Sequence, residues 1–87
     1  MSTKNVEMRP SQCRAARALL DITQGRLAEL AGMGLSTVVD FEKGRRKVSE
    51  EALRAMQGAL NRAGVEFIDE NGGGPGVRLR KGQKKKD

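Results

Sequence analysis

The segment 23–44 reads TQGRLAELAGMGLSTVVDFEKG, and this stretch decides the fold of the chain. Two glycines, Gly32 and Gly34, frame Met33 between two segments whose apolar residues recur at helical spacing. Glycine at position 32 allows a left-handed helix end without a steric penalty at Cβ, so the chain can turn sharply and begin a second helix. The stretch therefore predicts two short helices joined by a tight turn.

The first of these helices is expected from about Gln24 to Ala31, because the Thr23 hydroxyl is a suitable N-cap for it. The second is expected from Leu35 to Lys43. It ends where glycine follows at position 44. The residues expected to face the core are Leu27, Ala28 and Ala31 in the first helix, and Val38 and Phe41 in the second.

Outward from this pair, the pattern predicts one further helix on each side. A helix begins near Pro10, which is tolerated at a first helical position, and ends at about Leu20 or Asp21. A fourth helix begins after Ser49, a second candidate N-cap, and ends at Gly64. The apolar residues expected on one face of these helices are Cys13, Ala16, Leu19 and Leu20, and then Leu53, Met56, Leu60 and Ala63.

After residue 64 the apolar period changes from helical to alternating, which is typical of strands. Residues 65–68 and 77–80 flank an eight-residue loop and predict a β-hairpin. An isolated hairpin is marginal in water, so we expect it to pack on the helices or on a second subunit. The expected organisation is a flexible N-terminus at 1–9, a helical domain at 10–64, the hairpin at 65–80 and a disordered basic tail at 81–87.

Composition limits the function. The chain has 87 residues, two aromatic side chains, one cysteine and no histidine, which argues against a catalytic cleft, a metal site or a cofactor. No apolar run reaches the length of about 20 residues that a membrane span needs, and we expect a cytoplasmic protein. The net charge is +6, but residues 1–75 carry +1 and residues 76–87 carry +5. The charge is therefore mainly a property of the tail and does not by itself indicate a DNA-binding domain.

The residues of segment 23–44 resemble the phage-repressor/Cro-type helix-turn-helix family, also called XRE. The matching features are Gln24, Leu27-Ala28, Ala31-Gly32, Ser36-Thr37-Val38 and Phe41-Glu42-Lys43-Gly44. The resemblance implies a mainly α fold, namely a four-helix repressor-like helix-turn-helix domain, here followed by the β-hairpin and the basic tail. It also implies a DNA-binding regulator with no chemistry of its own.

In this family the second helix of the motif enters the major groove of DNA. Carried onto this sequence, the resemblance implies that Gln24 contacts a phosphate or supports a base contact. The residues that would face the groove from helix 35–43 are Leu35, Ser36, Thr37 and Asp40, with Lys43 at its end.

Several of these positions have a structural alternative. Leu35 can belong to the core or meet a thymine methyl group, and Ser36 and Thr37 can complete the helix start because Gly34 has no capping side chain. The carboxylate of Asp40 is repelled by phosphates unless it accepts a hydrogen bond from a cytosine amino group or serves to exclude wrong sequences.

Two further groups of residues complete the expected site. Arg45, Arg46 and Lys47 form a positive loop beside the reading helix, where they contact phosphates or the minor groove, or are ordinary solvated charges. Arg17 and Glu42 match family positions that form a partly buried ion pair between the first helix and the reading helix. Removal of one partner of such a pair leaves the other buried and uncompensated.

The leading hypothesis is a repressor that binds double-stranded operator DNA as a homodimer, with the end of the fourth helix or the hairpin as the dimer surface. A second hypothesis is an antitoxin-type protein that binds a toxin partner and regulates its own expression. A third is a sequence-neutral nucleic-acid-binding protein whose affinity comes from the basic tail, since specific DNA sites bind about 10³ to 10⁷ times more tightly than random DNA.

Overall fold

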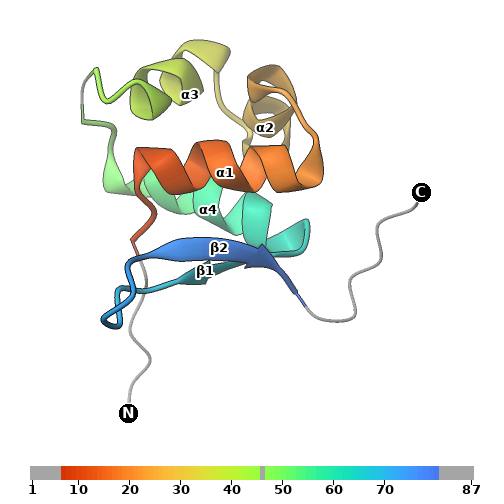
Figure 1. The fold of residues 1–87 in the computed structure, drawn as a ribbon. Helices are drawn as coiled ribbons and strands as arrows, with labels where there is room; N and C mark the ends of the chain where they lie inside the picture. The colour runs from red at the N-terminus through yellow and green to blue at the C-terminus, as the bar shows by residue number, and fades with distance from the viewer. Residues whose placement is uncertain (1–6, 46, 81–87) are drawn as a thin grey trace.

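The computed structural model describes residues 7–45 and 47–80 of the chain. Four helices lie on one side of a two-stranded antiparallel hairpin, as Figure 1 shows. This arrangement confirms the predicted fold class; the expected basic tail at 81–87 lies outside the described residues. The elements are α1 (Pro10–Leu20), α2 (Gln24–Ala31), α3 (Leu35–Glu42), α4 (Glu50–Arg62), β1 (Val65–Ile68) and β2 (Gly76–Leu79).

The turns between the first three helices follow from left-handed residues at the helix ends. Asp21 closes α1 with φ 59°, and Gly32 closes α2 with φ 70°. In each case the cap N–H and the next N–H bond carbonyls of the last helical turn, which is the Schellman arrangement. At the start of α2 the Thr23 hydroxyl accepts a hydrogen bond from the Arg26 N–H at 3.0 Å, as predicted.

Helix α3 ends at Glu42, one residue earlier than expected, and Lys43 is its C-cap. Gly44 follows with φ 65°, and its N–H bonds the carbonyl of Phe41. The Arg45 N–H bonds the carbonyl of Asp40 at 3.0 Å, which completes the same type of closing turn. The turn directs the chain away from the helix at the start of the basic loop.

The second half of the chain contains α4 and the hairpin. The Ser49 hydroxyl accepts from the Ala52 N–H at 3.0 Å and caps α4, as expected. In the hairpin, Val65 lies opposite Leu79 and Ile68 lies opposite Gly76. The loop therefore spans 69–75, one residue shorter than predicted, because Gly76 already belongs to the ladder.

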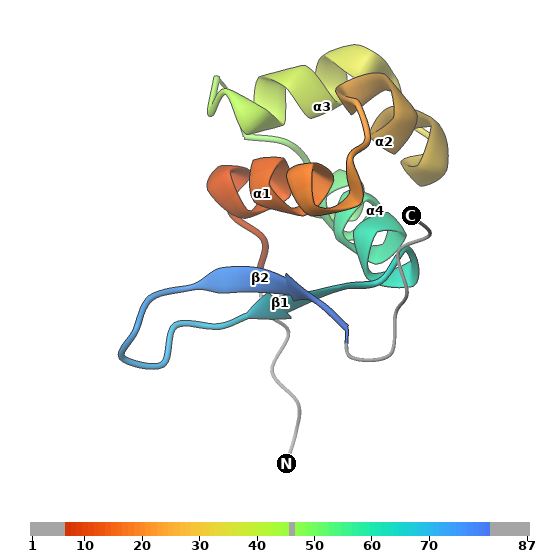
Figure 2. The same ribbon diagram turned by 45° about the vertical axis from the view of Figure 1, so that its right-hand side comes forward.

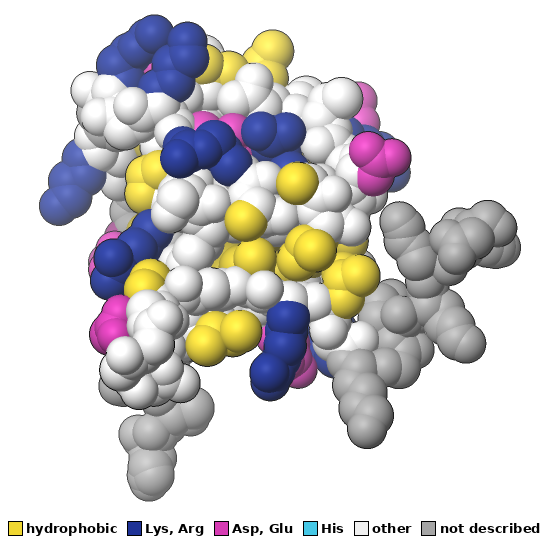
Figure 3. All heavy atoms as spheres, in the orientation of Figure 1, with side chains coloured by type: hydrophobic (Ala, Val, Ile, Leu, Met, Phe, Trp, Pro, Cys, Tyr) yellow, Lys and Arg dark blue, Asp and Glu magenta, His cyan; other side chains and the backbone are white. Residues whose placement is uncertain are grey.

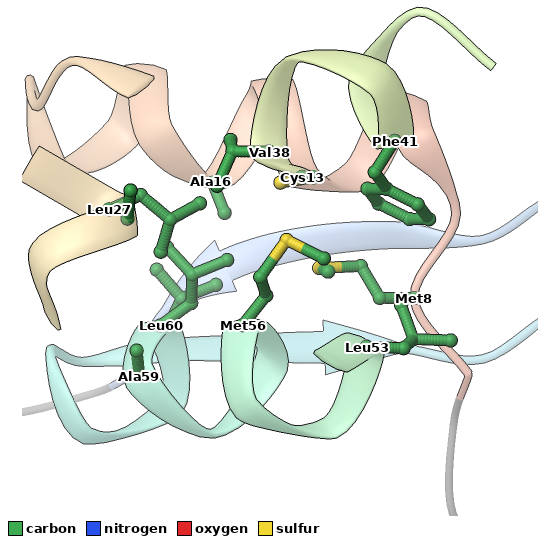
Figure 4. Packing of buried hydrophobic residues seen from close by; sticks show 12 residues of the cluster. Met8, Cys13, Ala16, Leu27, Val38, Phe41, Leu53, Met56, Ala59 and Leu60 are labelled. Atoms are coloured by element: carbon green, nitrogen blue, oxygen red, sulfur yellow. The ribbon is translucent and has the colours of Figure 1, made fainter. Parts of the chain in front are cut away.

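The core lies between the helices and the inner face of the hairpin (Figure 4). Met8 is only 2% exposed and packs in this core, so the flexible segment expected at 1–9 does not extend to the residues just before α1; residues 1–6 lie outside the described part. Aliphatic burial of this kind stabilises a small fold by about 1.5–3 kcal/mol per large side chain. The buried apolar residues are Met8, Cys13, Ala16, Leu27, Ala28, Val38, Phe41, Leu53, Met56, Ala59, Leu60 and Val65.

A buried glutamine, which the apolar pattern did not predict, joins α1 to the hairpin. The Nε2 amide of Gln12 donates to the carbonyl of Gly76 at 3.0 Å and lies 3.5 Å from that of Ile68. Its Oε1 accepts from the Arg9 N–H at 2.8 Å. Since Gln12 is 3% exposed, these bonds satisfy a polar group that water does not reach. The hairpin is thus tied to the helices by polar as well as apolar contacts.

Candidate DNA-binding surface

Helix α3 lies at the end of the molecule remote from the hairpin, as the two views in Figures 1 and 2 agree. Its inner face buries Val38 and Phe41, as predicted, and fixes its orientation. Leu35 is 51% exposed, which excludes the alternative that it belongs to the core. The outer face of α3 therefore offers an apolar side chain at the helix start.

The hydroxyl side chains at the start of α3 do not cap it. Its N-cap is Gly34, and no side-chain hydrogen bond is made there. The Thr37 N–H bonds the backbone carbonyl of Gly34 at 3.2 Å instead. Ser36 is exposed and Thr37 is half-buried, so both lie on or beside the outer face of the helix. The capping alternative for these two residues is therefore not what the structure shows.

The carboxylate of Asp40 lies beside the basic loop. Its Oδ1 is 3.5 Å from Nη1 of Arg45, with the Asp40 side chain 18% exposed and the Arg45 side chain 59% exposed. The Arg45 guanidinium thus lies close to α3 while more than half of the arginine side chain stays exposed. The nearby guanidinium partly offsets the negative charge of Asp40 on α3.

The Arg17 guanidinium and the Glu42 carboxylate form a bidentate ion pair between α1 and the end of α3. Nε and Nη2 of Arg17 lie 2.7 Å from Oε2 and Oε1 of Glu42, respectively. The Glu42 side chain is 2% exposed and the Arg17 side chain is 19% exposed. Two parallel charge-assisted bonds in this geometry hold α3 at a defined position on α1.

Two neutral donors complete the environment of Glu42, and the sequence pattern did not reveal them. The Cys13 thiol donates to Oε2 at 3.1 Å, and Nε2 of Gln24 donates to Oε1 at 3.0 Å. The sequence predicts Cys13 only as a core residue, and the family resemblance implies DNA contact for Gln24. Their shared partner is apparent only in three dimensions, because the three residues lie on three different helices.

The pKa values in this cluster follow from burial and hydrogen bonding. Burial would raise the pKa of Glu42, but the hydrogen bonds from Arg17, Cys13 and Gln24 outweigh it and hold that pKa below its ordinary value. Burial and the bond to Glu42 raise the pKa of the Cys13 thiol. The bond to Glu42 likewise raises the pKa of Arg17. At neutral pH the cluster contains a carboxylate, a guanidinium and a protonated thiol.

An open hollow lies between the start of α2 and the end of α3, and basic side chains dominate it. Four of its lining residues are Arg or Lys and one is Glu. Arg14, which sequence reasoning did not assign to the site, lines it and donates from Nη1 to the backbone carbonyl of Glu42. The lining residues are Arg14, Arg17, Thr23, Gln24, Glu42, Lys43 and Arg45.

The remaining predicted residues are the loop cations. Lys43 and Lys47 are exposed on either side of Gly44 and Arg45. Arg46 lies outside the described residues. The structure thus brings Gln24, Lys43 and Arg45 around one hollow at the end of α3.

A helix-turn-helix family model matches residues 14–67, which is more than half of the chain. The chain belongs to the phage-repressor/Cro-type helix-turn-helix family. The match extends from α1 through β1, so it covers the reading helix, its ion pair and the basic loop. No curated protein matches the chain.

Membership of this family makes the chain a DNA-binding helix-turn-helix protein. None of the helices in the described part is long and apolar enough to cross a membrane. Among residues 7–45 and 47–80, no three His, Cys, Asp or Glu side chains gather as a metal site would require.

Proposed function

We propose that this protein is a sequence-specific transcriptional regulator, a repressor, that reads the major groove of operator DNA with α3 and acts as a homodimer. The observation that carries the proposal is the geometry of α3. One face is locked into the core by Val38 and Phe41, and the Arg17–Glu42 pair holds its end. The opposite face is accessible at Leu35 and Ser36. A rigid helix with one free face is what base readout needs.

Basic side chains around this face supply the contacts to the DNA backbone. Arg14 on α1, with Lys43 and Arg45 after α3, is exposed around the hollow at the end of α3. Lys47 is exposed further along the loop that follows α3. Phosphate contacts of this kind set register and orientation but carry no sequence information. The N-terminus of α2 adds a partial positive charge at the same place.

In this proposal, side chains of α3 make the sequence-specific contacts to the bases. Leu35 meets a thymine methyl group, and the Ser36 and Thr37 hydroxyls donate to or accept from base edges. Asp40 acts mainly by holding Arg45 near the groove, since its carboxylate is mostly buried and paired. Gln24 supports the interface indirectly through Glu42, while its position at the start of α2 keeps it next to a phosphate.

The small size of the reading surface supports the homodimer of this proposal. A reading helix of eight residues covers a few base pairs, so a single copy offers few base contacts. Two copies related by a two-fold axis read two half-sites about one DNA turn apart and combine their affinities. A dimer bound across a promoter blocks access to it without any further activity, which is sufficient for repression.

A binding-site selection from random duplexes tests this function. We expect a near-palindromic site whose half-sites are about 10 base pairs apart and which binds at least about 10³ times more tightly than a scrambled duplex at physiological salt. Leu35→Ala should relax the preference at one base position in each half-site and leave the others unchanged. Equal affinity for selected and scrambled duplexes would exclude sequence-specific regulation and favour the sequence-neutral binder.

A further inference from the structure

The loop that joins β1 to β2 lies at the surface, at the end of the hairpin and remote from α3. Residues 69–75 read DENGGGP, and residues 69–73 are exposed. Figures 1 and 2 agree on this place, and in Figure 3 the region, at the lower left, consists mainly of white atoms, the colour of backbone and uncharged polar groups. In the loop Asn71 precedes a glycine, Gly72, whereas the two other asparagines of the chain precede valine and arginine. Asn71 is therefore the asparagine whose following backbone nitrogen is least hindered by a side chain.

A carboxylate lies beside this backbone nitrogen. Oε2 of Glu70 accepts a hydrogen bond from the Gly72 N–H at 3.0 Å and another from the Gly74 N–H at 3.1 Å. The first distance is within the reach that a general base needs for the proton that it removes. The second bond helps to hold the carboxylate in this place. Glu70 is thus positioned to make the Gly72 nitrogen more nucleophilic.

A backbone donor lies on the other side of the same step, at the side-chain amide of Asn71. Its Oδ1 accepts a hydrogen bond from the Gly73 N–H at 3.3 Å. Attack on Cγ places negative charge on Oδ1, and a fixed N–H donor stabilises charge that develops in this way. A Cβ built on Gly72 would meet nothing within 4 Å, so the nitrogen is open to approach. The loop therefore brings a nucleophile, a base and a donor to one amide.

We propose that Asn71 is a site of covalent self-modification, at which the loop converts the asparagine into aspartate and isoaspartate with water as the other reactant. Glu70 acts as the base, the Gly72 nitrogen as the nucleophile and the Gly73 N–H as the donor that stabilises the charged oxygen. The reaction needs neither DNA nor a second copy of the chain, so it is independent of the proposed function.

The reaction has two steps. In the first, the Gly72 nitrogen forms a bond to Cγ of Asn71 while the Glu70 carboxylate takes the proton of that nitrogen. The bond between Cγ and Nδ2 then breaks, Nδ2 receives the proton from Glu70, and ammonia leaves. The product is a five-membered succinimide ring. In the second step, water adds to one of the two ring carbonyls and opens the ring, which gives aspartate or isoaspartate. Glu70 ends as the carboxylate with which it began.

The modification changes the charge and the length of the hairpin loop. Either product adds a carboxylate to a loop that already contains Asp69 and Glu70. Isoaspartate also adds one atom to the backbone between β1 and β2, because the main chain then runs through the former side chain. Gln12 reaches the carbonyls of Ile68 and Gly76 at the two ends of this loop. We therefore expect the hairpin to loosen on α1, while the remote surface of α3 stays unchanged.

Peptide mapping of the full chain after incubation at neutral pH tests the site. Trypsin cuts after Lys and Arg, so Asn71 lies in the peptide 63–78 and Asn61 in the peptide 55–62. Asn61 is the internal control, because the N–H that follows it belongs to the end of α4. Asn71 should lose ammonia and gain isoaspartate at least about 10-fold faster than Asn61, since only its reacting groups are held together. Equal rates at the two asparagines would overturn the proposal.

Two variants separate the role of Glu70 from the general reactivity of an asparagine before glycine. Glu70→Gln keeps a side-chain oxygen that accepts the Gly72 N–H but removes the base, and the rate at Asn71 should fall at least about 5-fold. Glu66→Gln is the matched control, because it makes the same charge change on β1, where Glu66 pairs with Arg78 and not with the loop glycines. Its rate should equal that of the wild type.

Unfolding provides the second test of the geometry. In urea at a concentration that unfolds the chain, the difference between wild type and Glu70→Gln should disappear, because the folded loop holds the carboxylate against the nitrogen. An unchanged rate in Glu70→Gln, or a difference that persists in urea, would overturn the proposal. None of these measurements involves DNA, so a failure of the proposed function does not change their outcome.

Discussion

Replacement of Arg17 by Met should be one of the most damaging single substitutions that do not create a cavity. The change removes the two bonds of 2.7 Å that reach the Glu42 carboxylate and leaves only the Cys13 thiol and the Gln24 amide to solvate it. Because that side chain is 2% exposed, water cannot replace the lost charge. We expect a loss of about 3–5 kcal/mol in the free energy of unfolding, the range for a buried charge that loses its partner.

Substitution of the other partner, Glu42, should cost less stability, because the two side chains differ in burial. Glu42→Gln leaves Arg17 with a side chain that is 19% exposed and still bonds the Ile22 carbonyl, so water and backbone compensate it in part. We expect a loss of about 2 kcal/mol. In the double variant no buried charge remains, so its cost should fall short of the sum of the two single costs by about 2–3 kcal/mol.

Urea unfolding at pH 7 of the two single variants, the double variant and Arg26→Met measures these differences. Arg26 and Glu29 form an ion pair with a similar N–O distance of 2.9 Å, but both side chains are more than half exposed. This control should lose less than about 0.5 kcal/mol. The reasoning fails if Arg17→Met costs no more than Arg26→Met, or if the single costs add within about 0.5 kcal/mol.

Lowering the pH should change the stability of the wild type and of Arg17→Met by different amounts. The folded pKa of Glu42 is lowered relative to the ordinary value of 4.5, so its contribution to stability is complete above pH 4.5 and is lost as the pH falls through the folded pKa. In Arg17→Met the carboxylate is buried without its cation, and protonation relieves the cost. The difference in stability between wild type and Arg17→Met should therefore shrink as the pH is lowered from 7 towards 3, and a constant difference would contradict this assignment.

Three further predictions concern other parts of the chain. Asp21→Gly should raise the free energy of unfolding by about 0.5 kcal/mol in urea titrations, because a residue with a side chain occupies a left-handed position at φ 59°; an unchanged or lower value would mean that the aspartate compensates this strain. Gln12→Ala should cost about 1–3 kcal/mol, because buried backbone groups lose their partner, and it should speed hydrogen exchange of the hairpin amides more than that of α2; uniform exchange would contradict a local tie. Arg45→Ala with Arg46→Ala should weaken binding to all duplexes and reduce the slope of log affinity against log salt by about 2, whereas an unchanged slope would exclude phosphate contact.

Local sequence signals were sufficient for the helices and located their ends to within one or two residues. Thr23 and Ser49 cap α2 and α4 as predicted, because a side-chain hydroxyl finds its partner within three residues along the chain. Gly32 takes the left-handed conformation that is expected of a glycine in the turn between two helical segments. The inward positions of Val38 and Phe41 followed from spacing alone. These features depend on near neighbours, so a pattern in the sequence determines them.

The features that the sequence did not predict depend instead on contacts between residues that are distant in the chain. Met8 lies in the segment 1–9 that the sequence predicts to be flexible, yet it is 2% exposed and belongs to the hydrophobic core. Gln12 reads as a polar interruption in an apolar stripe until the hairpin supplies carbonyls for its amide. Arg14 reads as an ordinary surface charge, since the hollow that it lines forms only when α1, α2 and α3 meet.

The sequence by itself determined that this chain is a helix-turn-helix protein, because the segment 23–44 combines helical periodicity, a glycine turn and the residues of the family in one continuous stretch. Tertiary structure decided how α3 is held. The Glu42 carboxylate collects donors from Cys13, Arg17 and Gln24, and Asp40 pairs with Arg45. The physical reason is the sequence separation over which each interaction acts. Capping and helical periodicity depend on residues within one or two helical turns. The partner of a buried charge depends on how elements that are distant in sequence pack together.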